Sequence, residues 1–354
     1  MKPLFFISNE PFSGKSSVCI GVGKLLAERG LKIGYMKPLG TLPARIDGVI
    51  TDEDAKCVSD IFGIGNKLED ISPIVLTQQH HREGLRNSDF SKNFLDIVDK
   101  SYRKIKAGKD VVILEGAKSV EDGCFLKMSS RDICRRLGAK TILITKYSPE
   151  IVDHILYAKE FLKDCFAGVI INLVPESQLE YVEELILPFL KREKIEVAGC
   201  IASYSLLSSV SVKELAELLG GRIICAEGKA EELVETFMVG AMGQEQALKF
   251  FRRKADKAVI TGGDRADVQL AALETPTKCL ILTGNFQPSS VVLGRAEELG
   301  TPIIMVNYDT LTAVEKVGEI MGHVRLHEIK KIDKITEVLR ECINIDKLLE
   351  IANI

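Results

Sequence analysis

The sequence lacks three features, each of which would define a class of protein. Its nine cysteines include no Cys-x-x-Cys pair, and this scattered, odd-numbered set indicates reduced thiols rather than disulfides or a zinc site. No apolar run approaches transmembrane length, and the run 4–7 is too short for a signal peptide. Neither sign of charge dominates, because 47 Lys and Arg residues face 50 Asp and Glu residues. We therefore expect a cytoplasmic protein without nucleic-acid or anionic-membrane partners.

The chain of 354 residues, 46% of them hydrophobic, is longer than one core supports, so two domains are expected. In the first half, continuously apolar runs alternate with amphipathic stretches, which predicts a parallel sheet with crossover helices and an α/β fold. The predicted strands are 4–7, 32–36, 111–114, 141–145, 168–174 and 197–202. The predicted helices are 16–29, which ends at Gly30, and 93–105, 149–163 and 179–194.

A Ser/Leu-rich stretch at 203–209 interrupts this pattern, and a second alternating series follows it. We place the domain boundary there, which gives domains 1–205 and 206–354. The second, smaller α/β domain has predicted strands at 222–225, 257–261, 279–283 and 302–306. Residues 331–354 have helical spacing and are expected to cap this second domain.

Residues 3–17 form a short apolar run, a Gly-Lys-Ser turn and the start of a helix. This order is typical of a P-loop, in which backbone N–H groups and a helix N-terminus surround phosphates. Lys15 would reach the β- and γ-phosphates, and the Ser16 hydroxyl would ligate Mg²⁺. Asn9 replaces the usual first glycine, and Asn tolerates the left-handed backbone that this position needs. The predicted phosphate-binding residues are Asn9, Glu10, Gly14, Lys15, Ser16 and Ser17.

Carboxylates at two other places could complete a cation site. Glu115 directly follows the predicted strand 111–114, at the carboxyl edge where ligands of parallel sheets collect, and would bind or orient Mg²⁺. Asp52, Glu53 and Asp54 form an acidic cluster after the second strand. Such a cluster is either a solvated turn or a source of one metal ligand, for which we choose Asp54.

Two further residues lie at strand ends of the first domain. Lys37 follows the strand 32–36, and it is either a surface lysine or a cation that meets a γ-phosphate or an anionic substrate. Asn172 ends the apolar run Gly-Val-Ile-Ile at 168–171, at the same edge of the predicted sheet. Its amide can pair with a purine edge, or it can simply form a turn.

In the second half, the segment 261–267, Thr-Gly-Gly-Asp-Arg-Ala-Asp, follows a strand and opens a helix. Later strands end in polar residues too, so these ends would face one crevice. Ordinary turn and helix-cap chemistry is the alternative explanation of the same residues, and it needs no ligand. The residues of this second ligand site would be Asp264, Arg265, Thr283 and Asn307.

These motifs resemble a known pair of domains. The loop 8–16, Met-Lys-Pro at 36–38, Asp-Ala at 54–55, Glu-Gly-Ala at 115–117 and Asn172 resemble dethiobiotin synthetase. They resemble still more closely the dethiobiotin-synthetase-like amino-terminal region of phosphate acetyltransferases. The remaining residues look like the DRTGG domain that follows this region, with Gly-Gly before Asp-Arg in segment 261–267. The acetyltransferase catalytic domain that comes next in those proteins is not expected here, and neither is acetyl transfer.

The resemblance implies roles for individual residues. ATP phosphates would bind at Lys15 and Ser16, and the adenine edge at Asn172. Mg²⁺ would bind at Ser16, Asp54 and Glu115. Lys37 would assist at the transferred phosphate, so the catalytic residues would be Lys15, Lys37 and Glu115. In the synthetase a glycine pair follows Glu-Gly-Ala, but Lys-Ser occupies 118–119 here. This difference argues against carboxylation of a diamine.

Two functions are compatible with this resemblance. The chain would be a regulator that binds ATP and Mg²⁺, senses a small metabolite, forms a homodimer and signals to a separate enzyme of acetyl phosphate or acetyl-CoA metabolism. Alternatively, it would be an ATP-dependent ligase that phosphorylates a carboxylate or a carbamate. Turnover that depends on an added small acid or amine would distinguish the two.

Overall fold

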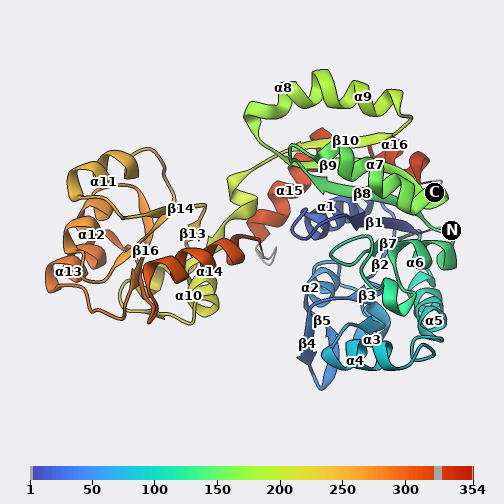
Figure 1. Cartoon of the computed structure of the whole chain (residues 1–354), viewed down its shortest axis with the longest axis horizontal. Helices are drawn as coiled ribbons and strands as arrows, with labels where there is room; N and C mark the ends of the chain where they lie inside the picture. The colour runs from blue at the N-terminus through green and yellow to red at the C-terminus, as the bar shows by residue number, and fades with distance from the viewer. Residues whose placement is uncertain (1–2, 323–328, 353) are drawn as a thin grey trace. The chain divides into compact units, whose positions relative to one another are not determined.

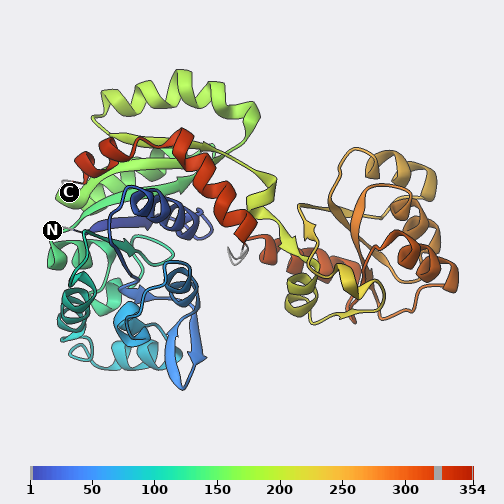
Figure 2. The same ribbon diagram turned by 180° about the vertical axis from the view of Figure 1, so that it is seen from behind.

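The computed structural model describes residues 3–322, 329–352 and 354. It divides into two compact units, unit 1 with Met1–Ser203 and Leu326–Ile354, and unit 2 with Tyr204–Arg325. Figures 1 and 2 show the elements of both units from opposite sides. Throughout the described ranges, no helix is both long and apolar enough to cross a membrane.

Unit 1 is built on a parallel six-stranded sheet with strand order β10-β9-β8-β1-β7-β2. The strands are β1 (Leu4–Ser8), β2 (Ile33–Met36), β7 (Val111–Glu115), β8 (Lys140–Lys146), β9 (Phe166–Val174) and β10 (Val197–Ala202). Each of the six predicted apolar runs is a strand of this sheet. Their continuous apolarity follows from burial on both faces, since the residues of β1, β2 and β7 are all buried.

Helices cover the sheet on its two faces (Figure 1). Helix α1 begins directly after the Gly-Lys-Ser turn, and Gly30, at φ +82°, follows its end. The main helices of this part of unit 1 are α1 (Lys15–Glu28), α5 (Phe94–Lys106), α6 (Ser130–Leu137), α7 (Ile151–Leu162), α8 (Leu179–Tyr181) and α9 (Leu187–Arg192). A π-helical turn, Val182–Ile186, joins α8 to α9, so the predicted helix 179–194 is one continuous but irregular element.

The segment between β2 and β7 contains elements that the sequence did not predict. They are the short pair β3 (Leu39–Gly40) and β6 (Ile74–Val75), the hairpin β4 (Pro43–Ile46) and β5 (Val49–Asp52), and the helices α2 (Glu53–Ile61), α3 (Leu68–Ile71) and α4 (Gln78–Arg86). The hairpin turns at Asp47 and Gly48, which both have positive φ. Helix α2 places the acidic cluster next to the main sheet.

The two C-terminal helices, α15 (Ile329–Cys342) and α16 (Ile345–Ile351), correct the predicted division 206–354, because they belong to unit 1. Helix α15 packs along α1, and the two lie side by side in both views (Figures 1 and 2). A Cβ on Gly21 of α1 would stand 2.4 Å from Leu339 Cδ1, so only glycine leaves room for the Leu339 side chain at this position. Arg340 of α15 also binds Glu28 of α1 at 2.7 Å. Helical spacing predicts such helices, but it does not say which sheet they cover.

Unit 2 has a five-stranded sheet with order β12-β17-β16-β15-β14. Its parallel strands are β14 (Thr236–Val239), β15 (Lys257–Gly262), β16 (Thr277–Thr283) and β17 (Ile303–Met305), and β12 (Arg222–Ile223) is the antiparallel edge. A separate two-stranded pair joins β11 (Val210–Ser211) to β13 (Leu233–Val234). The helices are α10 (Val212–Leu218), α11 (Gln244–Phe251), α12 (Ala266–Leu273), α13 (Ser290–Leu299) and α14 (Thr310–Gly322). Two buried apolar clusters, one on either face of the sheet, give this unit a core of its own.

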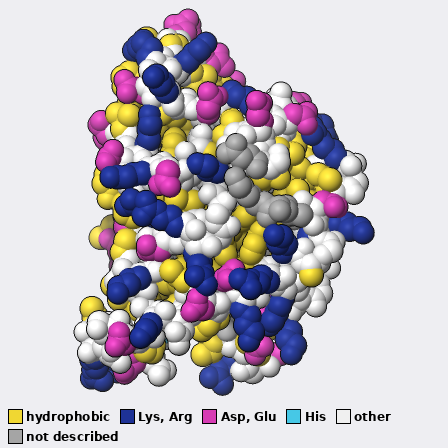
Figure 3. Space-filling view, turned by 90° about the vertical axis from the view of Figure 1, so that its right-hand side faces the viewer, with side chains coloured by type: hydrophobic (Ala, Val, Ile, Leu, Met, Phe, Trp, Pro, Cys, Tyr) yellow, Lys and Arg dark blue, Asp and Glu magenta, His cyan; other side chains and the backbone are white. Residues whose placement is uncertain are grey.

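The face shown in Figure 3 carries basic and acidic side chains intermingled, with apolar groups between them. In unit 1 several surface charges form ion pairs, including Arg136 with Asp96 at 2.6 Å and Arg103 with Asp99 at 2.8 Å. This pairing agrees with the near balance of positive and negative residues in the sequence.

Candidate nucleotide-binding site

The P-loop runs from the end of β1 to the start of α1, and its last turn depends on Gly14. This residue has φ +79°, and an added Cβ would stand 2.2 Å from Asn172 Nδ2. The same Nδ2 donates a 2.8 Å hydrogen bond to the carbonyl oxygen of Ser13. Both the left-handed backbone and the close amide therefore require glycine at this position.

Lys15 and Ser16 stand at the first turn of α1, as the P-loop prediction requires. Lys15 is half-buried, and its Nζ lies 3.4 Å from Ser8 Oγ. Burial lowers the pKa of Lys15, and the nearby Glu115 opposes this effect. Ser16 Oγ donates a 2.8 Å hydrogen bond to Glu115 Oε1. The three residues predicted to meet phosphate or Mg²⁺, namely Lys15, Ser16 and Glu115, thus lie together.

Glu115 ends β7, where its backbone pairs with Phe6 of β1. The side chain is only 1% exposed, so both oxygens need partners. Oε1 accepts from Ser16, and Oε2 accepts a 2.8 Å hydrogen bond from the Tyr35 hydroxyl. Burial and then Glu115 raise the pKa of Tyr35, which keeps its hydroxyl a donor. Sequence reasoning missed Tyr35, although a polar aromatic residue inside an otherwise apolar run was a signal.

Lys37 is a buried cation at the end of β2, not a surface lysine. Its Nζ donates to Asp52 Oδ1 at 2.8 Å and to Asp54 Oδ2 at 3.4 Å, and lies 3.8 Å from Glu115 Oε1. Burial opposes the charge of Lys37, but Glu115 and Asp52 outweigh it and raise the pKa of Lys37. The ammonium group is therefore charged and fixed at the carboxyl edge of the sheet.

The acidic cluster divides into residues with different surroundings. Asp52 is fully buried and caps α2, since its Oδ1 accepts from the Ala55 N–H at 3.0 Å. Asp54, on the first turn of α2, keeps a side chain 35% exposed near Lys37. Glu53 instead lines a hollow on the other side of α2. The cluster is not a solvated turn, and sequence reasoning overlooked the buried Asp52.

The remaining P-loop residues show unsatisfied polar groups. Glu10 Oε2 pairs with Lys146 Nζ at 3.1 Å. Within the part of the chain that the structure describes, Asn9 Oδ1, Glu10 Oε1 and Ser13 Oγ are buried without a hydrogen-bond partner. Ser17 is half-buried in the first turn of α1. Buried polar atoms without partners are uncommon, and these three lie in the loop that is predicted to bind phosphate.

A nucleotide with Mg²⁺ fits this arrangement. Among the described residues no three His, Cys, Asp or Glu side chains are grouped as a metal cage. Mg²⁺ does not need one, because it is commonly held by one or two carboxylates together with phosphate oxygens and water. Ser16, Asp54 and Glu115 would supply the protein ligands, and the P-loop N–H groups and Lys15 would face the phosphates.

Asn172 lies near the end of β9, and the structure shows it as a support of the P-loop. Its Nδ2 binds the Ser13 carbonyl, and its own carbonyl accepts from the Tyr147 N–H at 2.9 Å. The side chain is 4% exposed. Recognition of the adenine edge by this residue stays a prediction.

In unit 2, the predicted ligand residues lie at or just after the carboxyl ends of β15, β16 and β17, so they lie along one sheet edge. Asp264 and Asn307 are exposed. Arg265 is bound by Asp267, with Nε 3.1 Å from Oδ1 and Nη2 3.2 Å from Oδ2. Thr283 Oγ1 shares a 2.8 Å hydrogen bond with Thr310 Oγ1. The edge is polar, but its guanidinium is already paired within the protein.

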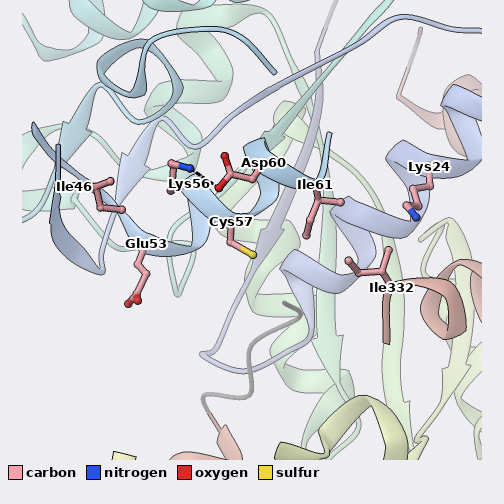
Figure 4. A pocket seen from close by; sticks show the side chains of 8 residues that line it. All are labelled: Lys24, Ile46, Glu53, Lys56, Cys57, Asp60, Ile61 and Ile332. Atoms are coloured by element: carbon pink, nitrogen blue, oxygen red, sulfur yellow. Dashed lines mark hydrogen bonds and ion pairs between the residues drawn. The ribbon is translucent and has the colours of Figure 1, made fainter. Parts of the chain in front are cut away.

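A hollow of about 510 Å³ lies between α1, α2, the β4–β5 hairpin and α15 (Figure 4). Lys56 and Asp60 pair with each other on its wall, and the Cys57 sulfur points inward. Apolar side chains from three elements complete it, namely Ile46, Ile61 and Ile332. None of the P-loop residues lines this hollow, so it is distinct from the candidate nucleotide site.

The sheet order, the turn and the buried Ser–Glu–Lys cluster define a P-loop protein of the α/β class. A family model described as an AAA domain matches residues 2–211, and a DRTGG domain model matches residues 214–320. The chain therefore belongs to this AAA-domain family and carries a DRTGG domain as its second unit. The predicted fold class and family resemblance are both confirmed.

Curated relatives agree with this assignment. The chain is 23% identical to a phosphate acetyltransferase of Pseudomonas putida, over 94% of this chain and 49% of that protein. It is 24% identical to a phosphate acetyltransferase of Nitratidesulfovibrio vulgaris, over 93% of this chain and 49% of that protein. An ATP-dependent dethiobiotin synthetase of Methanococcus vannielii is 24% identical, over 56% of this chain and 92% of that protein. The chain spans about half the length of the phosphate acetyltransferases that it matches.

Proposed function

We propose that unit 1 binds ATP with Mg²⁺ and that unit 2 senses a small metabolite, so that the chain regulates acetyl phosphate or acetyl-CoA metabolism. The relatives named phosphate acetyltransferase support this context, because they align with nearly the whole chain. A cytoplasmic homodimer that signals to a separate enzyme of that metabolism is part of the same proposal.

The hydrogen bond between Ser16 Oγ and Glu115 Oε1 carries the nucleotide part of the proposal. It joins a hydroxyl at the start of α1 to a strand-end carboxylate, and Lys15 lies beside them. In P-loop proteins such a hydroxyl and carboxylate hold Mg²⁺ while the lysine meets the phosphates. When bound, Mg²⁺ would neutralise phosphate charge.

Lys15→Ala is the direct test. Losing a charge-assisted contact to phosphate weakens ATP binding by about 1.5–3 kcal/mol, which isothermal titration calorimetry resolves. Lys24→Ala is the matched control, since Lys24 lies on the same helix but pairs with Asp333 at 3.6 Å beside the hollow. Equal ATP affinity in the Lys15 variant and the wild type would remove the P-loop assignment.

Glu115→Gln tests the metal part. The amide keeps the shape of the side chain but removes the negative charge that Mg²⁺ requires, so the Mg²⁺ dependence of ATP binding should weaken. If Mg²⁺ titrations of wild type and variant overlay, Glu115 is a structural partner of Tyr35 and Ser16 only.

Lys37 favours a second candidate function. A fixed, buried ammonium group near the phosphate loop can stabilise charge on a moving phosphoryl group, as in an enzyme that phosphorylates a carboxylate or a carbamate. ATP consumption that depends on an added small acid or amine would support this enzyme. Steady ATP binding without such turnover would support the regulator.

For unit 2 we propose a ligand crevice made by Asp264, Arg265, Thr283 and Asn307. A ligand anion would have to displace the Asp267 carboxylate from the Arg265 guanidinium group. Binding in this crevice should therefore depend on Arg265. A thermal-shift screen of nucleotides and central metabolites would find the ligand, and Arg265→Ala should abolish the shift. Arg295→Ala, which removes an exposed arginine of α13, is the control.

A further inference from the structure

The three carboxylates around Lys37 stand at unequal distances from its ammonium group. Asp52 Oδ1 is the nearest, at 2.8 Å. Asp54 Oδ2 follows at 3.4 Å, and Glu115 Oε1 is beyond hydrogen-bond length at 3.8 Å. Lys37 is thus bound chiefly to the one carboxylate that is not among the proposed Mg²⁺ ligands.

Asp52 is held firmly in this position. Its Oδ2 accepts hydrogen bonds from the N–H groups of Thr41 at 2.8 Å and Leu42 at 2.9 Å, and its Oδ1 accepts from Ala55. Gly40 packs so closely that an added Cβ would stand 2.6 Å from Asp52 Cβ. The side chain is fully buried, so it cannot follow Lys37 if the lysine moves.

The balance of charges in the site explains why the ion pair between Asp52 and Lys37 matters. Lys15 and Lys37 share the site with Asp52, Asp54 and Glu115, so carboxylates outnumber ammonium groups by one. An ammonium group on Asp54 and Glu115 would occupy the oxygens that a divalent cation needs. With Lys37 neutralised by Asp52, the other two carboxylates keep their attraction for a cation.

We propose that Asp52 is a positioning residue, which holds Lys37 on its own carboxylate and so keeps Asp54 and Glu115 free for Mg²⁺. The inference rests on the proposed Mg²⁺–nucleotide site. It assigns to the buried acid a role beyond capping α2. When a neutral residue replaces Asp52, Lys37 becomes a competitor of the metal for Asp54 and Glu115.

The test measures the Mg²⁺ concentration that half-saturates Mg²⁺-dependent ADP binding. ADP is the probe because it lacks the γ-phosphate that Lys37 is proposed to meet. Asp52→Asn should weaken Mg²⁺ binding by about tenfold to a hundredfold. This is the usual loss of affinity when a residue that orients the ligands of a metal ion is replaced. Asp60→Asn is the control, since Asp60 lies on the same helix, is 61% exposed and pairs with Lys56.

A second comparison separates positioning from mere structural support. In a Lys37→Met background, Asp52→Asn should leave Mg²⁺ binding unchanged, because no ammonium group remains to move onto Asp54 and Glu115. An equal loss in both backgrounds would show that Asp52 acts without Lys37 and would overturn the proposal. So would an Asp52→Asn protein with wild-type Mg²⁺ affinity.

Asp52→Ser guards against misfolding, since serine caps helices well but carries no charge. It should reproduce the loss seen with Asn. The single variant Lys37→Met tests the same proposal without a change at Asp52. Its Mg²⁺ affinity should equal or exceed that of the wild type. A weaker Mg²⁺ affinity in that variant would contradict the proposal. A wild-type chain that binds neither ADP nor ATP would instead overturn the nucleotide site itself.

Discussion

Gly14 shows most directly how the P-loop depends on single residues. Gly14→Ala combines a left-handed backbone with a collision against the Asn172 amide, so ATP binding should fall by more than tenfold, about 1.4 kcal/mol. Gly30→Ala is a matched control, because Gly30 has φ +82° but nothing within 4 Å of an added Cβ. It should lower the melting temperature slightly and leave calorimetric ATP affinity unchanged. Equal ATP affinity in both variants would mean that Asn172 yields without disturbing the loop.

Lys257 of β15 predicts a pH dependence of stability. Burial lowers the pKa of Lys257 to about 8, while in the unfolded chain the pKa returns to its usual value near 10.5. Between these values the unfolded state binds more protons, so the free energy of unfolding rises with pH. In urea unfolding, the free energy of unfolding of wild type should therefore rise relative to that of Lys257→Met between pH 8 and pH 10. Lys249→Met, at an exposed position of α11, should show the same rise.

Residues of the nucleotide site differ in how far sequence reveals them. Lys15, Ser16 and Glu115 were predictable, because a P-loop and a strand-end carboxylate are local patterns that parallel pairing brings to one edge. Asp52 was not, because only the fold shows which of three adjacent acids turns inward. Tyr35 was hidden for the same reason, since its partner Glu115 is far away in sequence.

At the level of elements, contact between helices α15 and α1 should contribute strongly to the stability of unit 1. Leu339 is fully buried against Gly21, so Leu339→Ala should destabilise the chain by about 2–5 kcal/mol. Hydrogen exchange should become faster in α1, while β16 of unit 2 stays protected. Leu85→Ala is the control and should change neither, because the Leu85 side chain on α4 is 78% exposed. Equal protection of α1 in both variants would show that α15 is dispensable.

The strands illustrate which elements a sequence predicts. All six predicted runs in unit 1 and all four in unit 2 contain strands. For all of them except the edge strand β12, burial on both faces leaves a signal that does not depend on distant partners. The hairpin β4–β5 and strand β14 (Thr236–Val239) were missed, since each strand has only four residues and most of these residues are half-exposed or exposed. The position of α15 and α16 depends on contacts with α1, which helical periodicity cannot encode.

For the whole molecule, the division into units predicts the behaviour of a fragment. Residues 204–325 form a unit with its own apolar clusters, so this fragment should fold alone. We also expect it to dimerise in sedimentation experiments. Exposed apolar side chains follow the carboxyl ends of its strands and would be covered by a second copy, namely Val239, Met242, Phe286 and Leu311. A folded but monomeric fragment would contradict the self-association part of the proposal.

The late position of α15 in the sequence has a consequence for synthesis on the ribosome. Unit 1 begins the chain, yet the helix that covers α1 is made only after the roughly 120 residues of unit 2. At about 5–20 residues per second, that delay is roughly 6–24 seconds. During this time the Gly21 side of α1 lacks its native cover, while unit 2 can already fold. A nascent chain paused in unit 2 should therefore present a nearly complete P-loop domain with one apolar helix face open to chaperones.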